Sequence, residues 1–287
     1  MFCRKCKCGA NIFVRIFHTL LCVGVPTSLL FKDTILRRAL VEMDNIFYGI
    51  GYIFVLLLSL SMYYTACFID PGFIPLKQKK ATINNNSDDD EDDENCTMLE
   101  CQNTDKHSQQ QYKYRRCDFC EIQQPMRAKH CEDCKRCVRK YDHHCPWLEA
   151  CVGERNHKYF LLFLLTTTTL VFWTLYITWK GITHDDKWSD WLNSNFIFFF
   201  DILILFFGGF VVLGLLFFHS YLMIKGMTTW EAASRERITY LKYLDDEYNP
   251  FDEGLCKNMY YFLCGCQVRD WETIYSKKAN VKDAGVV

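Results

Sequence analysis

Residues 196–224 read FIFFFDILILFFGGFVVLGLLFFHSYLMI, an apolar run in which Asp201 is the only charged side chain. A helix needs roughly 20 apolar residues to cross a hydrocarbon core about 30 Å thick, so this run is long enough to span a membrane. Three other apolar runs reach the same length, at residues 12–31, 46–68 and 159–179. One such run could be a buried helix of a large soluble protein. Four of them predict an all-α polytopic membrane protein with four transmembrane helices.

The first apolar run has a second possible interpretation. Basic residues at positions 4, 5 and 7 precede it, as they would in a secretory signal peptide. The run is long for a signal peptide, however, and Phe31-Lys32-Asp33 follows it in place of a small-residue cleavage site. We therefore expect a helix that is retained.

Basic residues predict how the helices are oriented. The segment 69–158 contains fifteen Lys and Arg, whereas 180–195 contains only Lys180 and Lys187. Because basic segments stay on the cytosolic side, we expect both termini and the long middle segment to be cytosolic. The loop after the first helix contains Lys32, Arg37 and Arg38, which favour the opposite orientation mildly. The formal net charge of −1 argues against a nucleic-acid partner, since binding phosphates needs a basic excess.

Seven of the seventeen cysteines lie between positions 117 and 151. They follow the pattern Cys117-x2-Cys120, His130-Cys131-x2-Cys134-x2-Cys137, Asp142-His143-His144-Cys145 and Cys151. A Cys-x2-Cys spacing holds two thiolates at the separation that tetrahedral zinc requires. Because the cytosol disfavours disulfides, the pattern predicts zinc sites.

The number of ligands leaves a surplus. Two closed zinc sites need eight ligands, and seven cysteines with three histidines make ten, so about two groups remain, at least one of them near residues 142–145. Zinc would supply the folding free energy of so short a segment. A spare cysteine beside Asp142 and His143 suits nucleophilic catalysis, because a neighbouring imidazole can take the proton of the thiol. The alternative is that Cys145 is one more zinc ligand in a binding module.

In these residues the chain resembles the DHHC-type protein S-acyltransferases, also called palmitoyltransferases, and in particular the small members of that family. The resemblance covers residues 117–160, including Pro125-x-Arg127 and Cys151-Val152-Gly153. Three shorter signatures also match: Asp70-Pro71-Gly72, Thr228-Thr229-Trp230-Glu231 and Asn249-Pro250-Phe251-Asp252.

The resemblance implies an assignment of the ligands. One structural zinc would bind Cys117, Cys120, His130 and Cys137, and a second would bind Cys131, Cys134, His144 and Cys151. This leaves Cys145 as the implied nucleophile and His143 as the implied base, with Asp142 orienting the histidine. The resemblance also implies that the motif 228–231 packs near this tetrad and that 249–252 ties the tail to the core.

The implied reaction transfers a long-chain acyl group, palmitoyl, from acyl-CoA to Cys145 and then to cysteine thiols of substrate proteins at the cytosolic membrane face. A sixteen-carbon chain carries on the order of 10 kcal/mol of hydrophobic free energy, which explains why the site would lie at a bilayer. We expect residues 166–170 to set the acyl length. The resemblance implies a location in the Golgi or the endoplasmic reticulum.

These interpretations divide the chain into six parts. They are a cytosolic N-terminus (1–11), transmembrane helices 1 and 2 (12–68), a cytosolic linker with an acidic run (69–114), the cysteine-rich zinc domain (115–158), transmembrane helices 3 and 4 (159–224) and a cytosolic tail (225–287). Seven consecutive acids at 88–94 predict a solvated spacer. We expect the tail to lie along the membrane face, and we find no evident internal repeat.

Two rival functions remain open. A membrane-anchored zinc module that recruits partners would need the zinc ligands but not Cys145. A small transporter would need charged or broken helices at mid-membrane. Asp201 and His219 lie near the ends of the last run, where we expect them to be interfacial.

Overall fold

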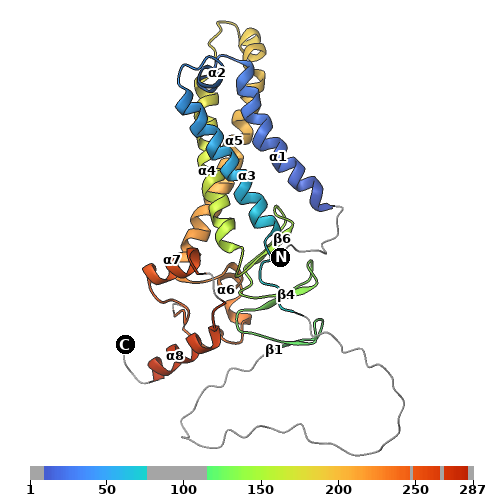
Figure 1. Ribbon diagram of the computed structural model, residues 1–287, viewed down its shortest axis with the longest axis vertical. Coiled ribbons are helices and arrows are strands. Elements are labelled where there is room, and N and C mark those ends of the chain that lie inside the picture. Colours follow the sequence, from blue (N-terminus) through green and yellow to red (C-terminus); the bar gives the residue numbers. More distant parts are fainter. Residues whose placement is uncertain (1–9, 76–114, 246–247, 266–267, 284–287) are drawn as a thin grey trace, which may run out of the picture.

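The structure is a computed structural model that describes residues 10–75, 115–245, 248–265 and 268–283. The predicted acidic spacer lies outside the described residues, as does most of the predicted N-terminal segment. Long helices form one end of the molecule and short hairpins with the tail form the other (Figure 1).

Four helices are long and apolar enough to cross a membrane. They are α1 (Ala10–Ser28, continued by the 3-10 turn Leu29–Phe31), α3 (Ile46–Phe68), α4 (His157–Lys180) and α5 (Trp188–Lys225). The predicted all-α polytopic membrane fold is therefore confirmed as a mostly helical one with four candidate spanning helices. The last helix begins at Trp188, eight residues before the start of the predicted apolar run. Within this added part, Asn195 accepts a hydrogen bond from the N–H of Thr183 and donates one to its carbonyl, which ties the helix to the preceding loop. That closes a shorter loop than the sequence suggests.

Helix α4 packs against both α3 and α5. Buried hydroxyl pairs join α3 to α4, with Tyr52 and Thr174 at 2.7 Å and Ser59 and Thr167 at 2.8 Å. The short helix α2 (Ile35–Val41) packs on α3. Large apolar side chains are exposed along α1, α3 and α5, as is expected of surfaces that face lipid. Asp201 is buried and accepts a hydrogen bond from Ser28, the last residue of α1; its expected interfacial depth in the membrane stays a prediction.

The cysteine-rich region consists of three antiparallel hairpins. They are β1 (Arg115–Cys117) with β2 (Ile122–Gln124), β3 (Lys129–Cys131) with β4 (Arg136–Val138), and β5 (His143–Cys145) with β6 (Ala150–Val152). Each hairpin starts fourteen residues after the previous one. The turns repeat as well, with left-handed φ angles at Glu121, Lys135 and Glu149. The expectation that the chain has no internal repeat is therefore wrong.

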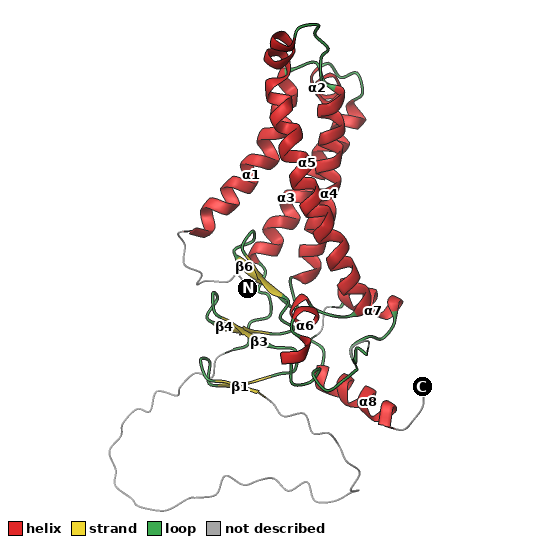
Figure 2. Cartoon of the chain, turned by 180° about the vertical axis from the view of Figure 1, so that it is seen from behind, coloured by secondary structure: helices red, strands yellow, loops and turns green. Residues whose placement is uncertain are grey.

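A tight turn joins α3 to the hairpins. The side chain of Asp70 accepts hydrogen bonds from the N–H groups of Gly72 and Phe73 at 2.9 and 2.8 Å. Gly72 has a φ of +106°, which favours glycine. The turn places Ile74 so that its N–H donates to the carbonyl of Cys137 at 2.9 Å, which fixes the hairpins at this end of the helices (Figure 2).

The tail packs on the hairpins. It contains α6 (Thr229–Ala233), a 3-10 turn (Arg235–Arg237), α7 (Leu255–Leu263) and α8 (Trp271–Asp283). Met126 shares one apolar cluster with Tyr240, Phe251 and Trp271 of the tail. The tail thus forms a common core with the cysteine-rich region, which corrects the expectation that it simply follows the membrane face. Asn249 donates to the carbonyl of Lys225, so the tail is tied to α5 as the resemblance implies.

Candidate active site and metal centres

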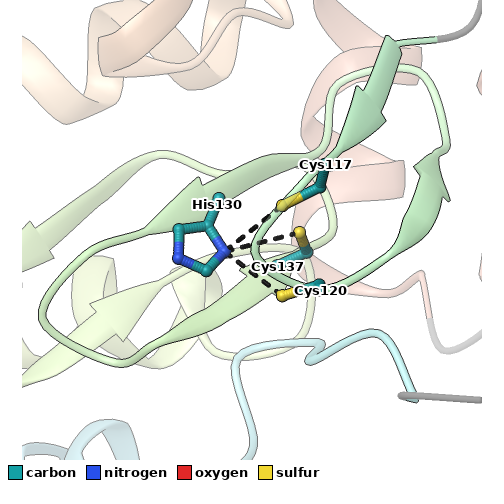
Figure 3. Close-up of side chains that lie close together, drawn as sticks. All are labelled: Cys117, Cys120, His130 and Cys137. Atoms are coloured by element: carbon teal, nitrogen blue, oxygen red, sulfur yellow. Dashed lines mark hydrogen bonds between the residues drawn. The ribbon is translucent and has the colours of Figure 1, made fainter.

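Two neighbouring hairpins form the first cysteine–histidine group. Cys117 and Cys120 come from the first hairpin, and His130 and Cys137 are opposite each other in the second. The Nδ1 atom of His130 lies 3.6, 3.2 and 3.8 Å from the sulfurs of Cys117, Cys120 and Cys137 (Figure 3).

The second group repeats this plan one hairpin further on. Cys131 and Cys134 come from the second hairpin, and His144 and Cys151 are opposite each other in the third. The Nδ1 atom of His144 lies 3.6, 3.5 and 3.7 Å from the three sulfurs. The second hairpin therefore contributes to both groups.

Both groups have the composition and spacing of a tetrahedral zinc site. Zinc bonds to sulfur at about 2.3 Å and to nitrogen at about 2.0–2.1 Å, so tetrahedral geometry separates such ligands by about 3.6 Å. The observed separations fall on both sides of that value, and each group offers three thiols and one imidazole. These are the two ligand sets that the resemblance implies.

The hairpin repeat explains why Cys145 belongs to neither group. Cys117, Cys131 and Cys145 are each the last residue of a hairpin's first strand. In the first two hairpins a second cysteine follows three residues later, but in the third hairpin Leu148 takes that position. Cys145 therefore lacks the partner thiol that its equivalents have. The sequence contains this signal, in its fourteen-residue period.

Asp142, His143 and Cys145 form one group of interacting side chains. His143 Nδ1 lies 2.6 Å from Asp142 Oδ2, and Cys145 lies close enough to His143 to raise the pKa of the imidazole. Thr229 donates its N–H and its hydroxyl to the same carboxylate, both at 2.8 Å. The resemblance's expectation that the motif 228–231 packs near the tetrad is confirmed.

The electrostatics of these groups favour a charged pair. Burial opposes protonation of His143, but the hydrogen bond with Asp142 and the neighbouring Cys145 outweigh it and raise the pKa of His143 to about 9. Burial alone would raise the pKa of Asp142, yet the neighbouring imidazoles, with the hydrogen bond from His143, hold it below its usual range. Asp142 is thus a carboxylate and His143 an imidazolium at neutral pH.

Two buried histidines that the sequence interpretation did not assign lie behind Asp142. His157 Nδ1 is 3.7 Å from Asp142 Oδ1, and His157 Nε2 is 3.2 Å from His219 Nδ1. His219 is 2% exposed and contacts the first residue of α4, and its expected interfacial position stays a prediction. The sequence did contain a signal for a buried polar contact at His219, because a histidine within an apolar run needs a polar partner.

Helices α1 and α3 hold the turn after Cys145. Arg15 donates a hydrogen bond to the carbonyl of Leu148 at 3.3 Å, and the hydroxyl of Tyr63 donates one to the carbonyl of Trp147 at 3.0 Å. Cys145 is buried in one apolar cluster with Tyr63 and with residues of α4 that include Phe160. A chain bound to the Cys145 sulfur would therefore have apolar neighbours.

A buried ion pair fastens the motif 228–231 to the hairpins. Arg127 donates two hydrogen bonds to Glu231, at 2.7 and 2.5 Å, and one to the carbonyl of Gly226 at 2.9 Å. The guanidinium lies over the rings of Phe251 and Trp271. Arg127 was singled out in the sequence only as part of a signature, and its partner lies 104 residues away.

Comparison with known proteins agrees with this site. A family model described as DHHC palmitoyltransferase matches residues 110–236. The chain is 35% identical to palmitoyltransferase ZDHHC12 of Homo sapiens over 268 residues, which is 93% of either protein. It is 38% identical to palmitoyltransferase ZDHHC12-A of Danio rerio over 271 residues, or 94% of this chain and 96% of the relative. It is 39% identical to protein S-acyltransferase 10 of Arabidopsis thaliana over 151 residues, covering 52% and 43%.

Proposed function

This chain belongs to the DHHC palmitoyltransferase family, and we propose that Cys145 is the nucleophile of its protein S-palmitoyltransferase reaction. The observation that carries the assignment is the position of Cys145. It is the one cysteine of the three hairpins outside both metal-binding groups, and it lies on the same strand as His143 and close enough to raise its pKa, while Asp142 orients His143.

The reaction has two steps. The thiolate form of Cys145 attacks the thioester carbonyl of palmitoyl-CoA, the bond from that carbonyl to the CoA sulfur breaks, and the His143 imidazolium supplies its proton to the leaving CoA thiolate. A thiol of the substrate protein then gives its proton to His143 and attacks the new thioester. The Cys145 thiolate leaves, and the acyl group ends on the substrate.

Asp142 acts through His143. Its hydrogen bond to Nδ1 leaves the other ring nitrogen of His143 for proton transfer. The eight ligand residues would hold two structural zinc ions. These ions would stabilise the fold of the hairpins that carry Cys145. The reaction steps themselves use only residues of the chain and the substrates.

The surroundings of Cys145 support a membrane substrate. Its apolar neighbours on α3 and α4 would accept the acyl chain, while CoA would remain on the water side. We propose that the hairpins and both termini face the cytosol of the Golgi or the endoplasmic reticulum, and that the substrates are proteins with cysteines at that surface. The role of residues 166–170 in acyl length remains a prediction, supported by the burial of Thr167 and Thr168.

An alkyne analogue of palmitoyl-CoA tests the assignment. The purified chain should take up label that hydroxylamine removes, and Cys145→Ser should abolish it while the zinc content is unchanged. Cys256→Ser is the matched control, since this cysteine is exposed on α7. Undiminished label in Cys145→Ser would overturn the assignment and favour the alternative, a membrane-anchored zinc module without catalysis.

A further inference from the structure

A cavity of about 50 Å³ lies where the hairpins, α4, α5 and the tail meet. Its lining includes four basic residues: Arg127, Lys140, Lys158 and Arg269. One water molecule needs roughly 10–15 Å³, so the cavity has room for a group larger than a single water.

Two of these four cations already have carboxylate partners. Arg127 pairs with Glu231, and Arg269 pairs with Glu253. Their positive charges are therefore largely neutralised within the protein.

The other two cations lack such partners. Glu154 is the only acidic residue among those that line the cavity, and it pairs with Arg139. Within the described ranges, neither Lys140 nor Lys158 forms an ion pair with a carboxylate. Glu231, Glu154 and Asp142 lie near enough to favour the charge of Lys140 without pairing with it. Two lysines at one small cavity thus carry charge that no carboxylate contacts directly, and this makes the cavity attractive to an anion.

The surroundings of Lys140 agree with that conclusion. Its ammonium lies over the rings of Phe262 and Trp271, at 5.7 and 5.2 Å from their centroids. Burial, with the nearby charge of Arg127, lowers the pKa of Lys140 to about 8. A bound anion would offset both effects.

We propose that this cavity binds the phosphate group of an anionic phospholipid, with Lys140 and Lys158 as its counter-charges. Leu222 and Met223, near the end of the spanning helix α5, line the same cavity. A ligand at this position needs an apolar part beside its anionic group. A phospholipid has both, and basic pockets between transmembrane helices bind lipid headgroups.

Helix α7 supplies further apolar surface beside the cavity. Phe262 lines it, while Leu255, Met259 and Leu263 of the same helix are exposed. Acyl-CoA also carries phosphates, but the cavity's volume suits a single phosphate group better than a nucleotide, for which pockets are typically 300 Å³ or more.

Native mass spectrometry of the purified full-length chain tests the proposal. The protein is incubated with equal amounts of phosphatidic acid and phosphatidylcholine that have the same acyl chains. The unaltered chain should retain phosphatidic acid at least about tenfold more than Lys140→Gln/Lys158→Gln, since each lysine contributes to holding the charge. The control Lys180→Gln/Lys187→Gln removes two lysines outside the cavity and should retain the lipid like the unaltered chain.

Equal retention by all three proteins would overturn the proposal. A second arm distinguishes CoA as the source of the phosphate. If the cavity variant raises the KM for palmitoyl-CoA about tenfold and retains phosphatidic acid normally, the site belongs to CoA and the lipid proposal is wrong. The zinc content of each variant shows that it has folded, and each single lysine variant replaces the double one if the double variant loses zinc.

Discussion

Thr229 donates both its N–H and its hydroxyl to the carboxylate of Asp142, at 2.8 Å each, from a position 87 residues further along the chain. The same carboxylate holds His143 through Nδ1. The orientation of the proposed base therefore depends on a residue of the segment that follows the last membrane helix.

Removing the Thr229 hydroxyl should slow acyl transfer. Thr229→Val keeps the shape of the side chain but removes one hydrogen bond to a charged group, which contributes about 1.5–3 kcal/mol. We expect the rate of acyl-enzyme formation at saturating palmitoyl-CoA to fall about tenfold or more, with the KM little changed. Thr229→Ser should restore the rate. Full activity of Thr229→Val would show that this contact does not position the base.

Breaking the ion pair between Arg127 and Glu231 should destabilise the junction of hairpins and tail. Both side chains are 1% exposed, and removing one partner of a buried pair costs about 3–5 kcal/mol. Glu231→Gln should lower the melting temperature in detergent and make the tail more susceptible to limited proteolysis.

The double variant Arg127→Met/Glu231→Leu is the control, because it leaves no unpaired buried charge. It should be more stable than Glu231→Gln. If Glu231→Gln melts like the unaltered chain, the pair contributes little to stability.

The two proposed zinc sites should respond separately to loss of a ligand. Cys120→Ala and Cys134→Ala should each reduce the zinc content from about two ions per chain to about one, as measured by elemental analysis. Cys134→Ala should lower activity more, because His144 of the same group lies between His143 and Cys145. Cys256→Ala should keep both ions. Two ions in Cys134→Ala would contradict the proposed ligand set.

Lys140 should make stability depend on pH. Its pKa is about 8 in the folded chain, whereas an ordinary lysine has a pKa of 10.5. Between pH 8 and pH 10.5, the unfolded chain therefore binds a proton that the folded chain does not. Its contribution to the free energy of unfolding therefore rises with pH across this window. In an uncharged detergent, Lys140→Met should melt at a higher temperature than the unaltered chain at pH 7.5, and this difference should shrink by pH 10. Lys180→Met serves as the control. A constant difference would show that Lys140 titrates normally.

Much of the architecture could be predicted from local patterns. The runs at 12–31 and 46–68 match the spanning segments, because length and hydropathy are properties of the segment itself. The start of α5 was predicted too late, because residues 188–195 are helical although several of them are polar, and a hydropathy pattern does not reveal such a stretch. Asn195 lies in this stretch and donates a hydrogen bond to the carbonyl of Thr183. The buried partners of Asp201 and His219 were also missed, because hydropathy does not reveal which neighbour a polar side chain meets.

By itself, the sequence determined that four segments are long and apolar enough to cross a membrane, that cysteine pairs form turns suited to zinc, and that two zinc sites would leave about two of the ten possible ligands over, at least one of them near residues 142–145. These properties act over a few residues or one helix length. Only the tertiary structure decided that Thr229 holds Asp142, that Glu231 pairs with Arg127, and that Lys140 and Lys158 share a cavity. Such contacts join residues 18 to 104 positions apart, and they depend on how the helices, hairpins and tail pack, which no local periodicity encodes.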